Sequence, residues 1–260
     1  MKRVGTCLLI VSLLYLLIPM DDVQAYGWGY KRSDKGNIPE IGVYEQLIKP
    51  YDAFYIGDSD KKEIYLTFDN GYEAGYTASF LDVLKKHDVQ ATFFVTGHYV
   101  KEESTLLNRM AEEGHIIGNH SYSHPDFTRM SKNEMEKELT RLDEAVKKVA
   151  NVETAPYLRP PRGTFDAQTL KWAEELGYAH IFWSVAFKDW ETDKQKGWQY
   201  SYESVMDQVH PGAIILLHTV SEDNARALDK IITKLKEDGY TFKNLDYLYM
   251  TEKINEPLLF

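Results

Sequence analysis

Short apolar runs alternate with longer amphipathic stretches over most of the chain. From residue 64 onward, runs rich in β-branched and aromatic residues predict buried strands, and stretches with apolar residues three and four positions apart predict helices. The predicted strands are Ile64–Phe68, Ala91–Val95, Ile116–Gly118, Tyr157–Arg159, His180–Val185, Ala213–Leu217 and Thr241–Phe242. The predicted helices are Ala78–His87, Ser104–Glu113, Ser131–Val149, Asp166–Leu176, Tyr202–Val209 and Asn224–Glu237.

The ends of these helices carry recognisable signals. Ser131 and Glu134 have the spacing of a capping box at the start of the longest helix. Gly114, Gly177 and Gly239 each end a helix, in the left-handed conformation typical of glycine, and a strand follows at once. This repetition predicts six or seven βα units around a parallel sheet. Because a Gly-x-Gly-x-x-Gly fingerprint is missing, a barrel or near-barrel is favoured over a dinucleotide-binding sheet.

The chain begins with the pattern of a secretory signal peptide. Two basic residues precede an apolar run from Cys7 to Ile18, and small residues allow cleavage after Ala25. A retained membrane anchor is the alternative, but the run is shorter than the roughly 20 residues that a spanning helix needs. We expect residues 1–25 to be removed and the protein to be exported, without stable membrane insertion.

Composition limits what the exported chain binds. The formal charge is -10, and loss of residues 1–25 leaves it unchanged because two basic and two acidic residues are removed. The one cysteine, Cys7, is lost as well, so no disulfide framework is expected. A net-negative surface argues against nucleic acid and against electrostatic docking on anionic membranes. We expect one domain at 61–250, an extension at 26–60 packed on it, and a tail at 251–260.

The extension contains an aromatic, glycine-rich segment from Tyr26 to Tyr30. Trp28 and Tyr30 either stack on sugar rings or anchor the extension to the domain. The second interpretation is favoured.

Polar residues stand directly after several predicted strands, at the sheet edge where α/β proteins carry their chemistry. Asp69 and Asn70 follow the first strand, either as site residues or as an Asx-type turn. His120 and His124 follow the third strand. Two imidazoles at this spacing can bind one metal ion, although surface histidines in a polar loop give the same pattern.

Further clusters follow the later strands. In Arg159-Pro-Pro-Arg-Gly163 the prolines rigidify a turn, and the forked Arg159 side chain suits a carboxylate such as Asp69. Asp189 and Trp190 follow the fifth strand. His218 follows four buried aliphatic residues, and its own strand leaves open whether it belongs to the core or to a site.

Taken in order, the five clusters resemble the motifs of the polysaccharide deacetylases of carbohydrate esterase family 4, the NodB-homology enzymes. They read Thr-Phe-Asp-Asn-Gly, His-Ser-x-x-His-Pro, Arg-Pro-Pro-Arg-Gly, Asp-Trp and Leu-Leu-His, over roughly residues 61–250. The resemblance implies an α/β, single-domain, distorted (β/α)7-type barrel. Asn70, Arg162 and the segment Trp28-Gly-Tyr-Lys-Arg are similar to the PdaA-type branch, the muramic δ-lactam-forming deacetylases of Bacillus spore cortex peptidoglycan.

The resemblance also implies the catalytic roles. Asp69 is expected to be the general base, with Arg159 orienting it and keeping it ionised. His218 is expected to be the general acid, and Asp189 to fix its tautomer and charge.

The implied cofactor is a divalent metal ion, zinc or a similar ion, bound by His120 and His124. Together with the backbone amide of Arg162, it would stabilise the oxyanion. The other residues expected to contact substrate are Trp190 and Leu216, as a pocket for the acetyl methyl, with Tyr72 and Gly163.

Two departures from the family pattern change these expectations. The family usually has a second aspartate as a metal ligand where this chain has Asn70, whose neutral carbonyl oxygen should hold the ion weakly and exchangeably. Asp126 is an alternative oxygen ligand. The family usually has an aromatic residue where this chain has Arg162, which could pair with the lactyl carboxylate of N-acetylmuramic acid.

The expected substrate is therefore a muramoyl residue in peptidoglycan glycan strands, with its lactyl group freed from peptide by an amidase. Two alternatives stay open. One is a general deacetylase of N-acetylglucosamine in peptidoglycan or chitin oligosaccharides. The other is a catalytically weak, glycan-binding homologue.

Overall fold

The computed structural model describes residues 24–255, so the predicted signal peptide lies almost wholly outside the described residues. The strands are β1 (Tyr26–Gly27), β2 (Ala53–Phe54), β3 (Glu63–Asn70), β4 (Thr92–Val95), β5 (Ile116–Asn119), β6 (Tyr157–Leu158), β7 (Thr164–Phe165), β8 (Ala179–Ile181), β9 (Ala213–His218) and β10 (Thr241–Lys243). The helices are α1 (Tyr44–Ile48), α2 (Thr77–His87), α3 (Gly97–Glu102), α4 (Ser104–Glu112), α5 (Lys132–Ala150), α6 (Ala167–Glu175), α7 (Trp198–Met206), α8 (Glu222–Glu237) and α9 (Leu245–Asn255), with 3-10 turns η1 (Phe127–Arg129) and η2 (Pro161–Gly163).

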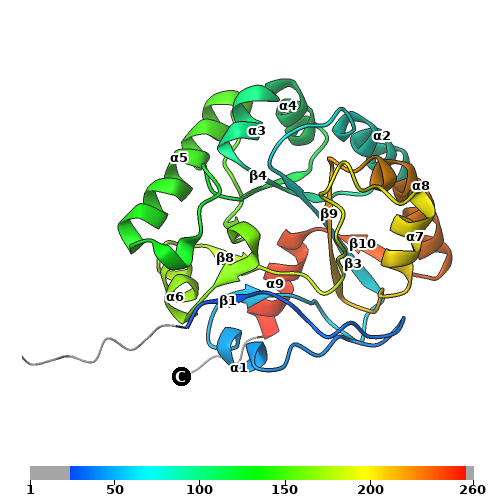
Figure 1. The fold of residues 1–260 in the computed structure, drawn as a ribbon, viewed down its shortest axis with the longest axis horizontal. Helices are drawn as coiled ribbons and strands as arrows, with labels where there is room; N and C mark the ends of the chain where they lie inside the picture. The colour runs from blue at the N-terminus through cyan, green and yellow to red at the C-terminus, as the bar shows by residue number, and fades with distance from the viewer. Residues whose placement is uncertain (1–23, 256–260) are drawn as a thin grey trace, which may run out of the picture.

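A curled parallel sheet forms the centre of the molecule, and most of the helices lie outside it (Figure 1). Neighbouring strands follow the order β10-β3-β4-β5-β6-β8-β2, and β9 pairs with β3 outside this series. A parallel bridge between Val185 and Ile215 joins the chain beyond β8 to β9. The sheet therefore curls back on itself, and the predicted distorted barrel of an α/β fold is confirmed.

Strand β3 is the best-connected strand of this sheet. It pairs with β4 over Thr67–Asn70, with β9 over Ile64–Asp69 and with β10 over Glu63–Tyr65. All of its residues are buried. Because successive side chains in a strand point to opposite faces, Thr67 and Asp69 share one face, while Phe68 and Asn70 share the other.

The predicted helices and strands are present, with the capping box of Ser131 and Glu134 formed at α5. The three glycine stops are confirmed, since Gly114, Gly177 and Gly239 have φ of 77°, 85° and 83°. Three helices, α1, α3 and α9, were not predicted, and α9 runs past the expected domain end at residue 250. Strand β8 ends at Ile181, earlier than predicted, because the chain beyond it turns toward β9.

The segment before β3 packs along one side of the barrel. Strand β1 pairs with β7 in a two-stranded antiparallel sheet. Trp28 is buried in an aromatic cluster and stacks on Phe182 with ring centroids 4.2 Å apart. Trp28 thus anchors the segment to the barrel.

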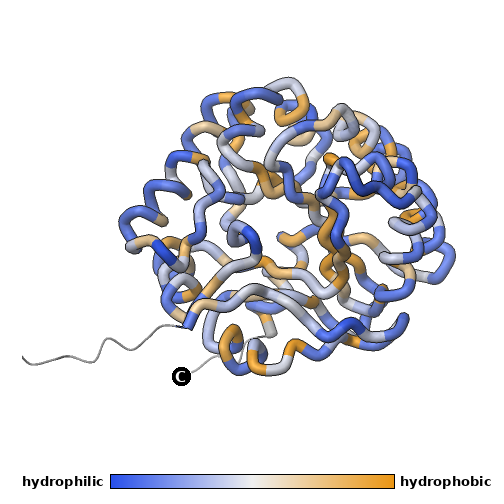
Figure 2. The backbone as a smooth tube through the Cα atoms, in the orientation of Figure 1, coloured by the Kyte–Doolittle hydropathy of each residue, from blue (hydrophilic) through white to orange (hydrophobic). Residues whose placement is uncertain are grey.

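The distribution of hydrophobic residues matches this arrangement of a central sheet with helices outside it. Figure 2 shows hydrophobic residues gathered along the central strands, while hydrophilic residues predominate on the outer turns of the helices. Among residues 24–255, no helix combines the length and the apolar character needed to span a membrane.

Candidate active site

A cavity of about 860 Å³ opens at the carboxyl ends of the strands. Its lining residues come from the ends of β3 and β9 and from the loops after β4, β5, β6 and β8. A volume of this size fits a small-molecule or oligosaccharide site. The clusters identified in the sequence therefore converge on one place.

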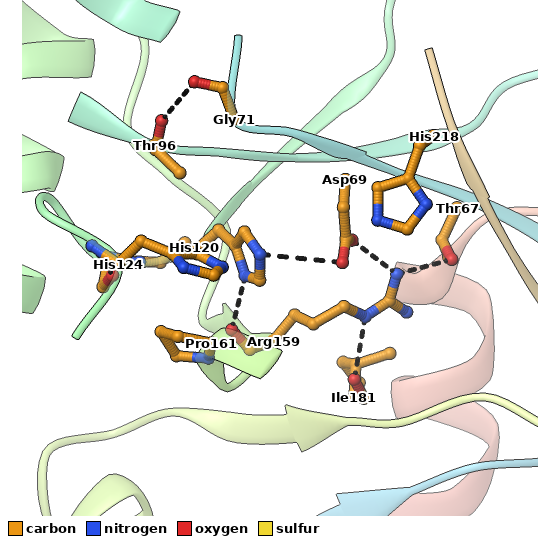
Figure 3. A network of polar contacts seen from close by, with 12 residues as sticks. Thr67, Asp69, Gly71, Thr96, His120, His124, Arg159, Pro161, Ile181 and His218 are labelled. Carbon is orange, nitrogen blue, oxygen red and sulfur yellow. Dashed lines mark hydrogen bonds and ion pairs between the residues drawn. The ribbon is translucent and has the colours of Figure 1, made fainter. Parts of the chain in front are cut away.

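A buried ion pair occupies the floor of this cavity. Arg159 Nη1 donates to Asp69 Oδ1 at 2.9 Å and to Thr67 Oγ1 at 2.8 Å, and Arg159 Nε donates to the carbonyl of Ile181 at 3.1 Å (Figure 3). Burial alone would raise the pKa of the Asp69 carboxyl, but the adjacent Arg159 guanidinium, through its charge and its hydrogen bond, holds it below its ordinary value. Asp69 is therefore ionised at neutral pH.

His120 and His124 lie beside this carboxylate. His120 Nδ1 donates to the carbonyl of Arg159 at 2.8 Å, and its Nε2 lies 3.6 Å from Asp69 Oδ2. The two imidazole rings are 4.8 Å apart between centroids, at an angle of 70°. Burial lowers the pKa of both, to about 4 for His124, so both rings are neutral near pH 7. Neutral imidazoles keep the lone pairs that metal binding requires.

The contacts of the Asn70 side chain indicate how well a divalent cation fits this site. Its Nδ2 donates to Thr219 Oγ1 at 2.7 Å, while its Oδ1 is buried and has no hydrogen-bond partner within the described structure. A buried acceptor without a partner costs about 1–3 kcal/mol unless something binds it. The two neutral imidazoles are suitable donors for a weakly held cation, whereas Asn70 lies on the opposite face of β3 from Asp69 and would have to turn its side chain toward the cavity to join them.

No cluster of three or more His, Cys, Asp or Glu side chains that could hold a metal occurs between residues 24 and 255. The alternative ligand, Asp126, is engaged elsewhere. Its Oδ1 accepts hydrogen bonds from the backbone N–H and hydroxyl of Thr128 and from the hydroxyl of Thr164. Asp126 caps η1 and ties two loops together.

His218 lies beside Asp69 in the cavity lining, because β9 pairs in register with β3. Its Nδ1 bonds Asp189 Oδ1 at 2.7 Å, and its backbone N–H donates to Asp189 Oδ2 at 2.8 Å. Burial alone would lower the pKa of His218, but the adjacent Asp189 carboxylate raises it above 6.5. With Nδ1 held by Asp189, Nε2 is the nitrogen free to exchange a proton with a ligand.

The remaining predicted residues form the walls and rim. Tyr72 and Trp190 are 46% and 48% exposed and line the cavity, and the Trp190 ring lies 5.4 Å from that of His218. Leu216 and Gly163 are buried parts of the wall. Arg162 is exposed on the rim, and no carboxylate of the described chain forms an ion pair with it.

Sequence reasoning missed several residues that hold the site together. Asn224 donates to Asp189 Oδ2 at 2.5 Å, Thr67 accepts from Arg159, and Trp183 lines the cavity. Thr67 could have been found, because it lies two residues before Asp69 and therefore on the same strand face. Asn224 carries no local signal, since its partner lies 35 residues earlier.

Comparisons with known proteins agree with this geometry. Residues 56–181 match a family model described as polysaccharide deacetylase. The chain is 53% identical over 237 residues to the peptidoglycan-N-acetylmuramic acid deacetylase PdaA of Bacillus subtilis, covering 91% of this chain and 90% of that protein. It is 34% identical to a peptidoglycan-N-acetylglucosamine deacetylase of Bacillus cereus, covering 93% and 85% of the two chains.

A comparison with solved structures also finds a peptidoglycan deacetylase relative of this chain. The structure of Bacillus subtilis PdaA, described as a family 4 carbohydrate esterase, superimposes with a TM-score of 0.85 at 54% identity. The match covers 88% of this chain and 98% of that one.

Proposed function

Since the chain belongs to the polysaccharide deacetylase family, we propose that it hydrolyses the N-acetyl group of N-acetylmuramic acid residues in peptidoglycan glycan strands. The products are acetate and a free amine on the sugar. The observation that carries this proposal is geometric: Asp69, paired with Arg159, and His218, paired with Asp189, lie in register on neighbouring strands and both line one cavity.

Asp69 acts as the general base. The Arg159 ion pair keeps it ionised, and the hydrogen bond to Arg159 Nη1 engages Oδ1, so Oδ2 is the oxygen available to take a proton from water. The resulting hydroxide attacks the acetyl carbon. A positioned base of this kind contributes typically 10²–10⁴ in rate.

His218 acts as the general acid. Its raised pKa favours the imidazolium form, in which Nε2 carries a proton that it can give to the leaving nitrogen as the C–N bond breaks. Asp189 fixes the tautomer and stabilises the imidazolium.

The residues that would hold a divalent cation are His120, His124 and, after its side chain turns toward the cavity, Asn70 through its carbonyl oxygen. When bound, the cation would supply Lewis-acid polarisation of the acetyl oxygen and lower the pKa of water. The backbone N–H of Arg162 would be a further donor to the oxyanion.

Arg162 supports a muramoyl substrate. It stands on the cavity rim without a carboxylate partner among residues 24–255, and guanidinium groups pair with carboxylates in bidentate fashion. N-acetylmuramic acid carries a lactyl carboxylate and N-acetylglucosamine does not. The lactyl group must be free of peptide to present this charge, so an amidase would act first.

Acetate release from purified, peptide-free glycan strands, measured with and without added divalent cation, tests this function. The wild-type protein should release acetate, and His218→Ala should lose about 10²–10⁴ in rate while keeping its fold and glycan binding. Binding without acetate release under every cation condition would favour the glycan-binding alternative.

A second assay addresses the sugar. Arg162→Ala should lose activity on muramoyl glycans and keep it on N-acetylglucosamine oligomers. Equal residual activity on the two would remove the argument for muramoyl specificity. A general N-acetylglucosamine deacetylase would then be favoured, consistent with the 34% identity to the Bacillus cereus protein.

The wider setting follows from this substrate. A free amine on a muramoyl residue is the species from which a muramic δ-lactam of spore cortex closes. The enzyme would act outside the cytoplasmic membrane, where peptidoglycan lies.

A further inference from the structure

The aromatic segment near the start of the described chain touches two walls of the active-site cavity from behind. Strand β1 pairs with β7, with Tyr26 opposite Phe165 and Gly27 opposite Thr164. Strand β1 is the only strand that pairs with β7 in the described structure. The segment directly after Arg162 is therefore held in place by β1, which lies more than a hundred residues earlier in the sequence.

Trp28 makes the contacts closest to the cavity. Its backbone N–H donates to the carbonyl of Gly163 at 2.8 Å, and its indole Nε1 donates to the carbonyl of Trp183 at 2.9 Å. Gly163 and Trp183 both line the cavity. One residue thus binds the wall after β6 and the wall after β8.

The wall that Trp28 holds is under conformational constraint. Arg162 has φ 59° and Gly163 has φ 66°. A residue other than glycine in this region costs roughly 1–2 kcal/mol, so neighbouring contacts must hold it there. A Cβ on Gly163 would lie 3.0 Å from the Trp183 ring and 3.3 Å from Trp28 Cβ, so Trp183 and Trp28 would have to shift to admit another side chain.

We propose that Trp28 is a positioning residue for the specificity of the cavity: it fixes the Arg162–Gly163 turn and the Trp183 wall, and so places Arg162 for the substrate carboxylate. This inference rests on the proposed function. It assigns the extension before residue 56, which lies outside the matched family region, a part in substrate selection.

The test measures kcat/KM on peptide-free muramoyl glycan strands and on N-acetylglucosamine oligomers, and takes their ratio. Trp28→Ala should lower this ratio roughly ten-fold or more, because small displacements of a positioned group cost up to about 10² in rate. Trp28→Phe keeps a ring over Phe182 but loses the indole donor. Its ratio should therefore also fall, but by less than that of Trp28→Ala. Both variants keep the backbone N–H that donates to Gly163, so amide hydrogen exchange at residues 163–165 should accelerate in Trp28→Ala, which loses the packed ring, and change little in Trp28→Phe.

Ile48→Ala is the matched control. Ile48 is buried at 4% exposure in the same aromatic cluster, but it belongs to α1 and not to the paired segment. It should lower the melting temperature while leaving the substrate ratio within about two-fold of wild type.

An unchanged ratio in Trp28→Phe would overturn the positioning role of the indole, even if Trp28→Ala fails to fold. A wild-type protein without activity on either substrate would instead count against the proposed function. The exchange data would still decide whether Trp28 holds the turn.

Discussion

Three residues other than glycine hold left-handed backbone around the cavity: Ser121, His124 and Arg162, with φ of 64°, 58° and 59°. Each conformation costs roughly 1–2 kcal/mol and needs local support. Ser121 N–H donates to Asn119 Oδ1, and His124 N–H donates to Ser121 Oγ. The site is therefore held in one shape before a ligand arrives.

The partnership of Asp189 and His218 predicts a shift in pH dependence. Activity needs an ionised Asp69, whose pKa lies below 3.8, and a protonated His218, whose pKa lies above 6.5, so the profile of kcat/KM is bell-shaped. Asp189→Asn removes the charge that raises the pKa of His218. The alkaline limb should then move to lower pH, while the acid limb stays in place. If the alkaline limb does not move in Asp189→Asn, it reports the titration of a group other than His218.

Asn70 predicts weak cation binding. The wild-type protein should lose its divalent ion on dialysis against chelator. In Asn70→Asp a carboxylate replaces the amide, and the added charge should tighten binding about ten-fold or more. The Nδ2 donor to Thr219 is lost, so stability should fall by about 1 kcal/mol. Calorimetric titration of the stripped proteins measures the affinity, and equal affinities would remove Asn70 from the site.

At the scale of elements, helix α5 supports the loop that carries the two histidines. Glu138 accepts from the backbone N–H of Ser123 at 2.7 Å and from its hydroxyl at 2.8 Å. The Arg141 guanidinium lies 3.7 Å from the ring centroid of Tyr122. Asn119 donates to Asp143 at 2.8 Å. The histidine loop is thus fixed to α5 at three points.

Removing one of these contacts should loosen the loop. Glu138→Ala should weaken divalent-ion affinity about 10- to 100-fold, the usual cost of losing an outer support of a metal site, and speed hydrogen exchange in residues 121–124. Glu136→Ala is the control, because Glu136 lies exposed on the same helix and carries the same charge. Similar behaviour of the two variants would show that α5 does not position the histidines.

Local patterns predicted most elements, and they failed where the signal is not local. The capping box and the glycine stops marked α5 and three helix ends correctly. Helix α3 was missed because Thr96 caps a short helix that begins with glycine. The ion pair of Arg159 with Asp69 joins residues 90 positions apart, so the local spacing of residues could not predict it. It was predicted only because the order of the sequence motifs resembles that of a known family.

At the scale of the whole molecule, the base and the acid come from different parts of the chain. Asp69, His120 and Arg159 precede residue 181, where the matched family region ends, and Asp189 and His218 follow it. The cavity exists only when both parts are folded together. A fragment ending at residue 181 would therefore lack the acid.

Export makes a prediction for the intact chain. When residues 1–260 are expressed in a secreting bacterium, the processed protein should begin at Tyr26, because cleavage is expected after Ala25. N-terminal sequencing of the exported protein measures this directly. A product that starts at Met1 and stays with the membrane fraction would indicate a retained anchor.

The pairing of β3 with β9 also sets the order in which the polypeptide can fold. Thr67 donates to the carbonyl of Ile215, 148 residues later in the sequence. Contacts this distant form slowly, and an incomplete β3 exposes an edge that can pair with other chains. A polypeptide that emerges from a translocation channel N-terminus first therefore waits for its last third before its central strand is complete. Loss of the C-terminal strands would lower refolding yield and promote aggregation.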